Sequence, residues 1–198
     1  KKNCTTKFDE SIDLSLKINN KQKKNEVNIR TVVNMPSGTG KKIKIAVVCE
    51  ESKFQICRDS GADTVGSDDF IEKIKSGELN FDKLICTPLM MIKLSKLGKI
   101  LGPKGLMPNP KLGTVTNDLK KAITDAKMGQ IEIKNDKDGN IAASIGKKSF
   151  SDTKIIENYK ELIKTVLREK PKAIKGEFIL SSFLTSTMGI SYKLKLRA

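Results

Sequence analysis

Histidine is absent from this sequence of 198 residues, and arginine occurs only four times, at positions 30, 58, 168 and 197. Histidine is the commonest general base in enzymes and the usual partner of a nucleophilic serine or cysteine. Without histidine, most acid–base and nucleophilic mechanisms lack their usual catalytic residue. We therefore do not expect an enzyme.

The four cysteines also lack the spacing of a metal site, since Cys4, Cys49, Cys57 and Cys86 form no CxxC pair. Without histidine, we expect no zinc site of the usual spacing, and no other metal or cofactor. Cys49 and Cys86 end apolar runs, which predicts small buried side chains in a reducing compartment. No apolar run has the length of a membrane span, and no signal peptide is visible.

Positive charge is abundant instead. The 38 basic residues exceed the 23 acidic ones, giving a formal net charge of +15 and a pI near 9.6. Such an excess favours a polyanionic partner, most often a nucleic acid. A Lys-rich composition can also reflect an AT-rich genome, but this explains lysine in place of arginine better than it explains the excess itself.

The first half of the chain changes its hydrophobic pattern near residue 40. Residues 9–18 alternate apolar and polar, which predicts a half-buried strand, and after a polar turn at 19–25 a second strand at 26–33 is expected to pair with it. Further on, expected strands at 43–49, 63–66 and 83–86 alternate with expected helices at 51–60, 68–76 and 88–97. This alternation is typical of a parallel sheet with helices on both faces.

The second half of the chain returns to the α+β pattern of the opening segment. We expect a helix at 117–127, a hairpin of strands 130–135 and 140–145 around Asp138-Gly139, a long amphipathic helix from Ser151, and strands at 177–185 and 190–197. A discontinuous α+β domain, 1–36 and 114–198, would then enclose an inserted α/β domain, 37–113. The two crossings predict a hinge at Gly and Pro positions. These are Pro36, Gly38, Gly40, Pro110 and Gly113.

Two glycine-rich stretches invite a phosphate-binding interpretation. Ser37–Lys42 (SGTGKK) lacks the Walker spacing, and its glycines precede the expected strand at 43–49 instead of leading from a strand into a helix, so it favours a hinge loop over a nucleotide site. Gly98–Gly113 (GKILGPKGLMPNPKLG) contains three prolines and three lysines among apolar residues. It can contact phosphates or form a packed junction, and we place the junction first.

Several segments, in order, resemble the large-subunit ribosomal protein one family. They are KFDESIDLSL, PSGTGKKIKIAVV, NFDKLICTP, GPKGLMPNPKLGTVT, NDKDGNI and TSTMG. The resemblance implies a terminal RNA-binding α+β domain and an inserted Rossmann-like three-layer α/β domain. It further implies a bacterial-type, monomeric component of the ribosome in the cytoplasm or an organelle. The family begins with a helical segment that has no counterpart here, so we expect a chain trimmed at its start.

The resemblance also implies the partners: the stalk region of large-subunit rRNA, exit-site tRNA and the protein's own mRNA, whose translation it would repress. The expected RNA-binding residues lie in three segments and one strand. They are Lys7, Phe8, Lys134, Asp136, Lys137, Ser181, Thr187, Met188 and Gly189. The plain alternatives are a core phenylalanine at Phe8, a solvated hairpin turn at 134–137 and an ordinary β-turn at 187–189.

Two further classes of function stay open on the sequence alone. A nucleotide-dependent enzyme built on the middle α/β segment predicts saturable binding of a mononucleotide. A general polyanion binder, attracted by lysine charge alone, predicts steep salt dependence with no preference among RNA sequences.

Overall fold

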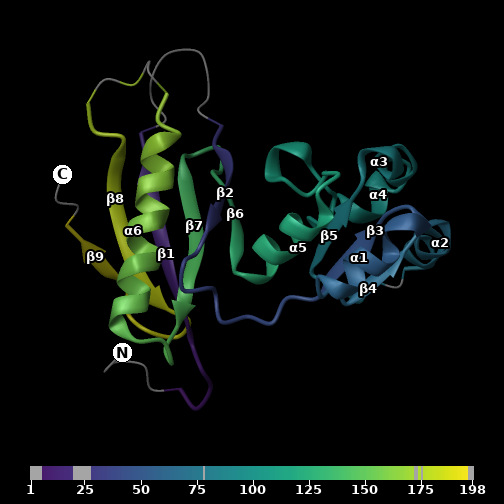
Figure 1. Ribbon diagram of the computed structural model, residues 1–198. Helices are drawn as coiled ribbons and strands as arrows, with labels where there is room; N and C mark the ends of the chain where they lie inside the picture. Colours follow the sequence, from purple (N-terminus) through teal and green to yellow (C-terminus); the bar gives the residue numbers. More distant parts are fainter. Residues whose placement is uncertain (1–5, 20–27, 78, 172–173, 175, 196–198) are drawn as a thin grey trace. The chain divides into compact units, whose positions relative to one another are not determined.

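The computed structural model describes residues 6–19, 28–77, 79–171, 174 and 176–195 (Figure 1). It divides the chain into two compact units. Unit 1 comprises residues 1–40 and 128–198, and unit 2 comprises residues 41–127. The chain therefore passes between the units twice, at 40–41 and at 127–128. Cys4 and most of the polar turn expected at 19–25 lie outside the described residues.

Unit 1 is built on a four-stranded antiparallel sheet with the order β7-β1-β8-β9. Its strands are β1 (Ser11–Ile18), β7 (Asn140–Lys147), β8 (Ile179–Ser186) and β9 (Tyr192–Leu194). A second sheet pairs β2 (Arg30–Asn34) with β6 (Gln130–Lys134). The expected pairing of the first two strands with each other is therefore wrong, because each is paired with strands from the second half of the chain. The hairpin expected at 130–145 likewise keeps its turn, while its two strands belong to different sheets.

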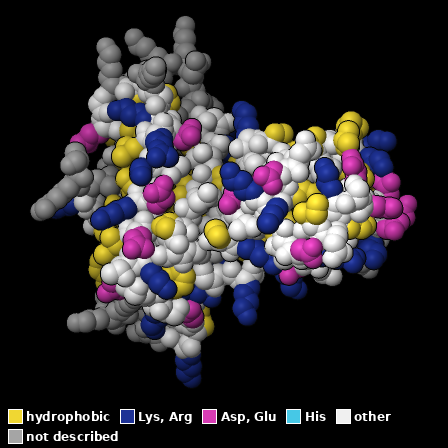
Figure 2. All heavy atoms as spheres, in the orientation of Figure 1, with side chains coloured by type: hydrophobic (Ala, Val, Ile, Leu, Met, Phe, Trp, Pro, Cys, Tyr) yellow, Lys and Arg dark blue, Asp and Glu magenta, His cyan; other side chains and the backbone are white. Residues whose placement is uncertain are grey.

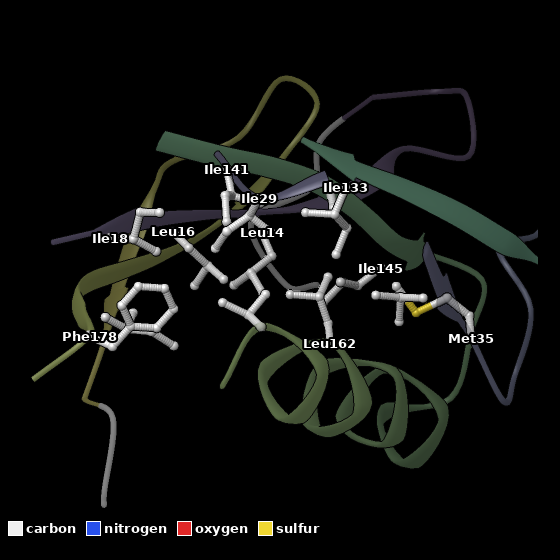
Figure 3. Packing of buried hydrophobic residues seen from close by; sticks show 14 of the residues in the cluster. Leu14, Leu16, Ile18, Ile29, Met35, Ile133, Ile141, Ile145, Leu162 and Phe178 are labelled. Atoms are coloured by element: carbon white, nitrogen blue, oxygen red, sulfur yellow. The ribbon is translucent and has the colours of Figure 1, made fainter. Parts of the chain in front are cut away.

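Helix α6 (Asp152–Arg168) covers one face of the four-stranded sheet. The helix begins within one residue of the expected start at Ser151, and Ser151 is its N-cap, its hydroxyl accepting from the Lys154 amide at 3.5 Å. Leu14 and Leu16 of β1 point toward Leu162 of the helix in a shared core (Figure 3). Because side chains alternate along a strand, the polar residues of β1 lie on the other face of the sheet.

Unit 2 contains a parallel sheet of order β4-β3-β5. Its strands are β3 (Ile45–Val48), β4 (Thr64–Gly66) and β5 (Lys83–Cys86). Alternate side chains of β3 enter two separate cores, Ala46 and Val48 on one face and Ile45 and Val47 on the other. The first core is completed by three helices, α2 (Asp68–Lys75), α3 (Pro88–Ser95) and α4 (Gly98–Leu101). The second core is completed by two helices, α1 (Phe54–Asp59) and α5 (Leu119–Lys127). A 3-10 turn, η1 (Glu51–Lys53), precedes α1. The expected three-layer α/β arrangement is confirmed.

The second boundary between the units lies later than residue 113. Helix α5 packs Leu119, Ile123 and Ala126 against β3 and β5. Without this helix, only the six residues of α1 would cover that face of the parallel sheet. The assignment of residues 114–127 to the terminal unit is therefore wrong, since the amphipathic pattern shows that a helix is buried but not against what.

The Gly98–Gly113 stretch is an ordered junction inside unit 2. After α4, Leu106 and Met107 pack on the first core, and a 3-10 turn, η2 (Pro110–Leu112), ends at Gly113 with φ +69°. The Asn109 amide donates to the Thr114 hydroxyl at 2.7 Å and closes the turn. Pro110 and Gly113 thus lie well before the crossing at 127–128, and their assignment to a hinge is wrong.

Cys49 and Cys86 are fully buried, as their positions at the ends of apolar runs predicted. Burial raises the thiol pKa of each to about 12. Within the described part of the chain, no helix has the length and apolar character needed to cross a membrane.

Candidate nucleic-acid interface

The turn at Thr187–Gly189 follows β8 and is fastened to the start of β1. The Ser11 amide donates to the Thr187 hydroxyl at 3.0 Å, and the Thr187 amide donates to the Ser11 carbonyl at 3.1 Å. Met188, at the tip, is 72% exposed. An apolar side chain is therefore presented to solvent from a backbone that is tied to the sheet.

The Thr187 hydroxyl is already engaged within the protein. It accepts from the Ser11 amide and donates to the Ser11 carbonyl at 3.3 Å. A hydroxyl has one donor and two acceptor sites, so one acceptor site is left. Thr187 primarily positions the turn, and its hydroxyl can accept at most one further hydrogen bond.

The segment around Lys7 and Phe8 lies at the same end of the sheet. Both side chains are exposed, Phe8 by 54%, which argues against a core role for this phenylalanine. The next residue, Asp9, fixes the segment to the end of β7, accepting from the Ser149 amide at 3.0 Å and from its hydroxyl at 2.9 Å. A second exposed apolar group is thus held beside the first residues of β1.

The face of the sheet opposite α6 is lined by small polar and charged side chains. In the strand register, Lys17 lies opposite both Asn140 and Ser181, and Asp13 lies opposite Thr185. Opposed residues of antiparallel strands share a face, so these side chains form rows across the sheet. Ser181 belongs to the row that is farthest from the Thr187–Gly189 turn.

The turn at 135–139 lies at this far end of the sheet, because it leads into Asn140 opposite Lys17. Along β1, this end is about 20 Å from Ser11 at a rise of ~3.3 Å per residue. The structure therefore does not bring all nine expected residues together. They form two groups, one at each end of a sheet face, with Asp13, Ser15, Phe183 and Thr185 between them.

Within the far group, Asp136 has a structural task. Its carboxylate accepts from the Asn140 amide at 2.6 Å and from the Asn140 side chain at 2.9 Å. These two hydrogen bonds lower the pKa of Asp136. Since both oxygens are engaged within the turn, the exposed cations Lys134 and Lys137 are the members of this group that can approach a phosphate.

Sequence reasoning missed Glu10, which is fully buried beside the Thr187–Gly189 turn. The Thr6 hydroxyl donates to its carboxylate, and this hydrogen bond lowers the pKa of Glu10 to about 2, together with the nearby Ser186 hydroxyl and the backbone amides of Thr6 and Met188, although burial acts in the opposite direction. A signal was present in the sequence. Glu10 is in phase with Ile12, Leu14 and the other buried residues of β1.

The low pKa predicts how acid destabilises unit 1. A carboxyl group stabilises the folded protein when its pKa is lower in the folded than in the unfolded state. For Glu10 this contribution is complete above its unfolded pKa, near 4.5, and is lost as the pH falls toward its folded pKa of about 2. We expect the urea midpoint of unit 1 to fall across this range, and to fall less in Glu10→Gln. Both tyrosines, Tyr159 and Tyr192, lie in unit 1, so tyrosine fluorescence follows this unit alone. Identical pH profiles for the two proteins would contradict the prediction.

Charge on the side of unit 1 that bears α6 is mixed. Lys and Arg side chains alternate there with Asp and Glu, without a continuous basic area (Figure 2). Phosphate attraction alone therefore does not single out this side as an RNA-binding surface.

Comparison with known proteins decides the family. The model of the "Ribosomal protein L1p/L10e family" matches residues 1–190. The chain belongs to this family. It is 67% identical over 197 residues to "Large ribosomal subunit protein uL1" of Pelagibacter ubique, covering 99% of this chain and 86% of that protein. Proteins of the same name from Orientia tsutsugamushi strain Ikeda and Rickettsia africae are 48% and 45% identical, each over 96% of this chain and 76% and 80% of their own lengths.

Membership in the ribosomal protein L1 family makes the chain a structural ribosomal protein of bacterial type and not an enzyme. Its bacterial relatives indicate a cytoplasmic ribosomal protein, and they carry the name of a large-subunit protein. The interpretation as a nucleotide-dependent enzyme is therefore wrong. Its glycine-rich loop, Ser37–Gly40, lies in unit 1, where the Ser37 amide and the Gly38 carbonyl hydrogen-bond to Asn158 of α6.

Proposed function

We propose that this L1 family member binds the stalk region of large-subunit rRNA through unit 1. The observation that supports this most is the Thr187–Gly189 turn, where Met188 is 72% exposed on a backbone tied to Ser11. Structured RNA presents 2′-hydroxyls and base edges in a shallow groove, which a fixed protrusion can approach closely. Phe8 adds an aromatic surface, on which a base or sugar can stack.

The open sheet face extends this surface toward the second group of residues. Hydroxyl groups of Ser15, Ser181 and Thr185 suit contacts with 2′-hydroxyls, and Lys134 and Lys137 at the far end suit phosphates. In this proposal the turn and Phe8 provide sequence and shape preference, while the lysines contribute affinity that falls with salt.

The proposal is tested by binding the chain to a stalk-derived rRNA hairpin and to a scrambled RNA of equal length. We expect tighter binding of the hairpin, and a loss of about tenfold for Met188→Ala, the effect of removing one well-packed contact. The matched control is Ile156→Ala, which removes an apolar side chain that is 50% exposed on α6. Filter binding across a salt series measures both. Equal affinity for the two RNAs, with no effect of Met188→Ala, would leave a general polyanion binder.

We further propose that the same surface binds a stalk-like structure in the protein's own mRNA and so represses its translation. A single surface for both RNAs requires that Met188→Ala weakens the two by the same factor. Adding the mRNA leader to the binding series checks this, and nuclease protection of the leader that survives the substitution would contradict it.

Exit-site tRNA is the partner we propose for the assembled protein, with unit 2 moving on the two crossings to guide or release deacylated tRNA. The crossing at Gly40 supports this, because its φ of +72° is a conformation that glycine adopts at low cost. Pro36 and Gly38 precede it, and Gly38 is held in unit 1 by Asn158, which leaves 40–41 and 127–128 as the places for bending. Fluorescently labelled tRNA on ribosomes with and without the chain tests the proposal, since equal release rates would refute it.

A further inference from the structure

The two segments at the near end of the sheet meet at one buried carboxylate. Glu10 Oε1 accepts from the Thr6 amide at 3.4 Å and from the Thr6 hydroxyl. Thr6 precedes Lys7 and Phe8, and its hydroxyl also lies 3.4 Å from the Phe8 carbonyl. Glu10 therefore holds the segment that presents Phe8.

The same carboxylate faces the turn that presents Met188. Its Oε2 is fully buried and, among the described residues, has no hydrogen-bond partner. In the pairing of β1 with β8, Ser186 lies opposite Ile12, which is two residues after Glu10, so the Ser186 and Glu10 side chains lie on the same face of the sheet. The Ser186 hydroxyl and the Met188 amide thereby help to lower the pKa of the carboxyl group. A buried carboxylate requires donors of this kind, since an uncompensated charge in the interior is costly.

The glycine of the turn fits this arrangement. A Cβ on Gly189 would lie 2.1 Å from the Ser186 Oγ, so the serine hydroxyl occupies the space that any other residue at 189 would fill. A larger residue would rotate that hydroxyl away from its present position. The small size of Gly189 thus protects the position of a donor to Glu10.

We propose that Glu10 is a positioning residue for RNA recognition, whose ionised carboxylate sets the Lys7-Phe8 segment and the Thr187–Gly189 turn in register with each other. This inference rests on the proposed rRNA binding. The expected effect of removing this charge on RNA affinity is opposite to the usual one. Removing a negative charge should strengthen attraction to a polyanion, whereas removing this one weakens the specific complex because the turn loses its acceptor.

The test is Glu10→Gln in the intact chain, with the stalk-derived hairpin and the scrambled RNA as probes. Glutamine has the same shape as glutamate, but one of the two carboxylate oxygens is replaced by an NH₂ group, which donates and cannot accept. Either the Thr6 donors or the Met188 amide would then face this NH₂ group instead of an oxygen. We expect hairpin affinity to fall about tenfold, as for the loss of one hydrogen bond to a charged group, while scrambled RNA binds equally well or more tightly. The slope of log Kd against log salt should stay unchanged, because no phosphate contact is removed.

Glu161→Gln is the charge-matched control, since Glu161 lies on α6 and pairs at 3.9 Å with Lys164. It should not weaken binding to either RNA. A local measurement separates positioning from general instability: amide exchange of Met188 should accelerate at least tenfold in Glu10→Gln, with the amides of the β1 and β8 ladders unchanged. Hairpin affinity and Met188 exchange equal to those of the unsubstituted chain would overturn the inference.

Two other outcomes are also decisive. If the unsubstituted chain does not prefer the hairpin, the proposed function fails and the recognition role of Glu10 falls with it, a result visible before any variant is compared. If tyrosine fluorescence shows that Glu10→Gln does not fold, Ser186→Ala decides instead, since it removes one donor to the carboxylate. We then expect hairpin affinity to fall about threefold, and unchanged affinity would overturn the inference.

Discussion

Gly129→Ala is expected to destabilise unit 1 by about 3 kcal/mol or more. Gly129 has φ +104°, and a Cβ built on it would lie 2.6 Å from the Gly38 Cα and 3.0 Å from the Thr39 amide nitrogen. Both neighbours are backbone atoms, which cannot rotate aside as a side chain can. The two chain segments that lead to and from unit 2 would have to separate.

Urea unfolding followed by tyrosine fluorescence measures this loss, because both tyrosines belong to unit 1. Gly176→Ala is the matched control. Gly176 also has a positive φ, +89°, in the same unit, but apart from its chain neighbours no described residue lies within 4 Å of its Cβ position. The control should cost only about 1 kcal/mol, the conformational penalty alone. Equal losses for the two variants would show that the Gly38 contact is unimportant.

Asn158→Ala is the second substitution with a large expected effect, about 3 kcal/mol on the stability of unit 1. Asn158 is fully buried on α6. Its side-chain amide donates to the Gly38 carbonyl at 3.0 Å and to the Ile145 carbonyl at 2.8 Å, and its oxygen accepts from the Ser37 amide at 3.1 Å. Alanine would leave three backbone groups without these partners, and unpaired buried groups are more costly than an exposed hydrogen bond.

Glu157→Ala provides the comparison at the neighbouring position. It removes only the exposed hydrogen bond from the Ser37 hydroxyl, at 3.0 Å, and should cost less than about 1 kcal/mol. The same fluorescence measurement applies. If Asn158→Ala were no more harmful than Glu157→Ala, water would be replacing the lost partners, and the glycine-rich loop would not depend on Asn158.

These two positions also bear on the motion proposed for unit 2. Residues 37 and 38 are fixed to α6 by Asn158, and Gly38 touches Gly129 at the return crossing. Bending before Gly38 would break these contacts. The proposed hinge is consequently narrower than the glycine and proline content of residues 36–40 indicates.

Local pattern was sufficient for much of the fold. The alternation of Ile12, Leu14, Leu16 and Ile18 predicted a half-buried strand, and the stripe from Ile155 to Val166 predicted a helix buried on one side. The near-continuous apolar run at 43–49 predicted a strand covered on both faces, because such strands need no polar side. The ribosomal family followed from motifs distributed along the chain.

The pairing of these elements was decided only in three dimensions. Amphipathicity indicates that a helix is buried on one side, but not against which partner, so the pattern alone places α5 in the wrong unit. Strand pairing has the same ambiguity, because β1 offers its hydrogen-bonding edges equally to any strand, and β7 and β8 reach them from more than 100 residues away.

The composition and motifs of the sequence therefore determined the class of protein, its ribosomal family and the segments expected to contact RNA. The tertiary structure decided how those segments are held. It engaged the Asp136 carboxylate within its own turn, paired the Thr187 hydroxyl with the Ser11 backbone, and buried Glu10 beside Thr6 and the end of β8. The physical reason is that a polar side chain's role depends on its partners. Some of those partners are near in the sequence, as Asn140 is to Asp136, and others are far away, as Ser11 is from Thr187. The identity of a residue specifies which hydrogen bonds it can make but not with which partner.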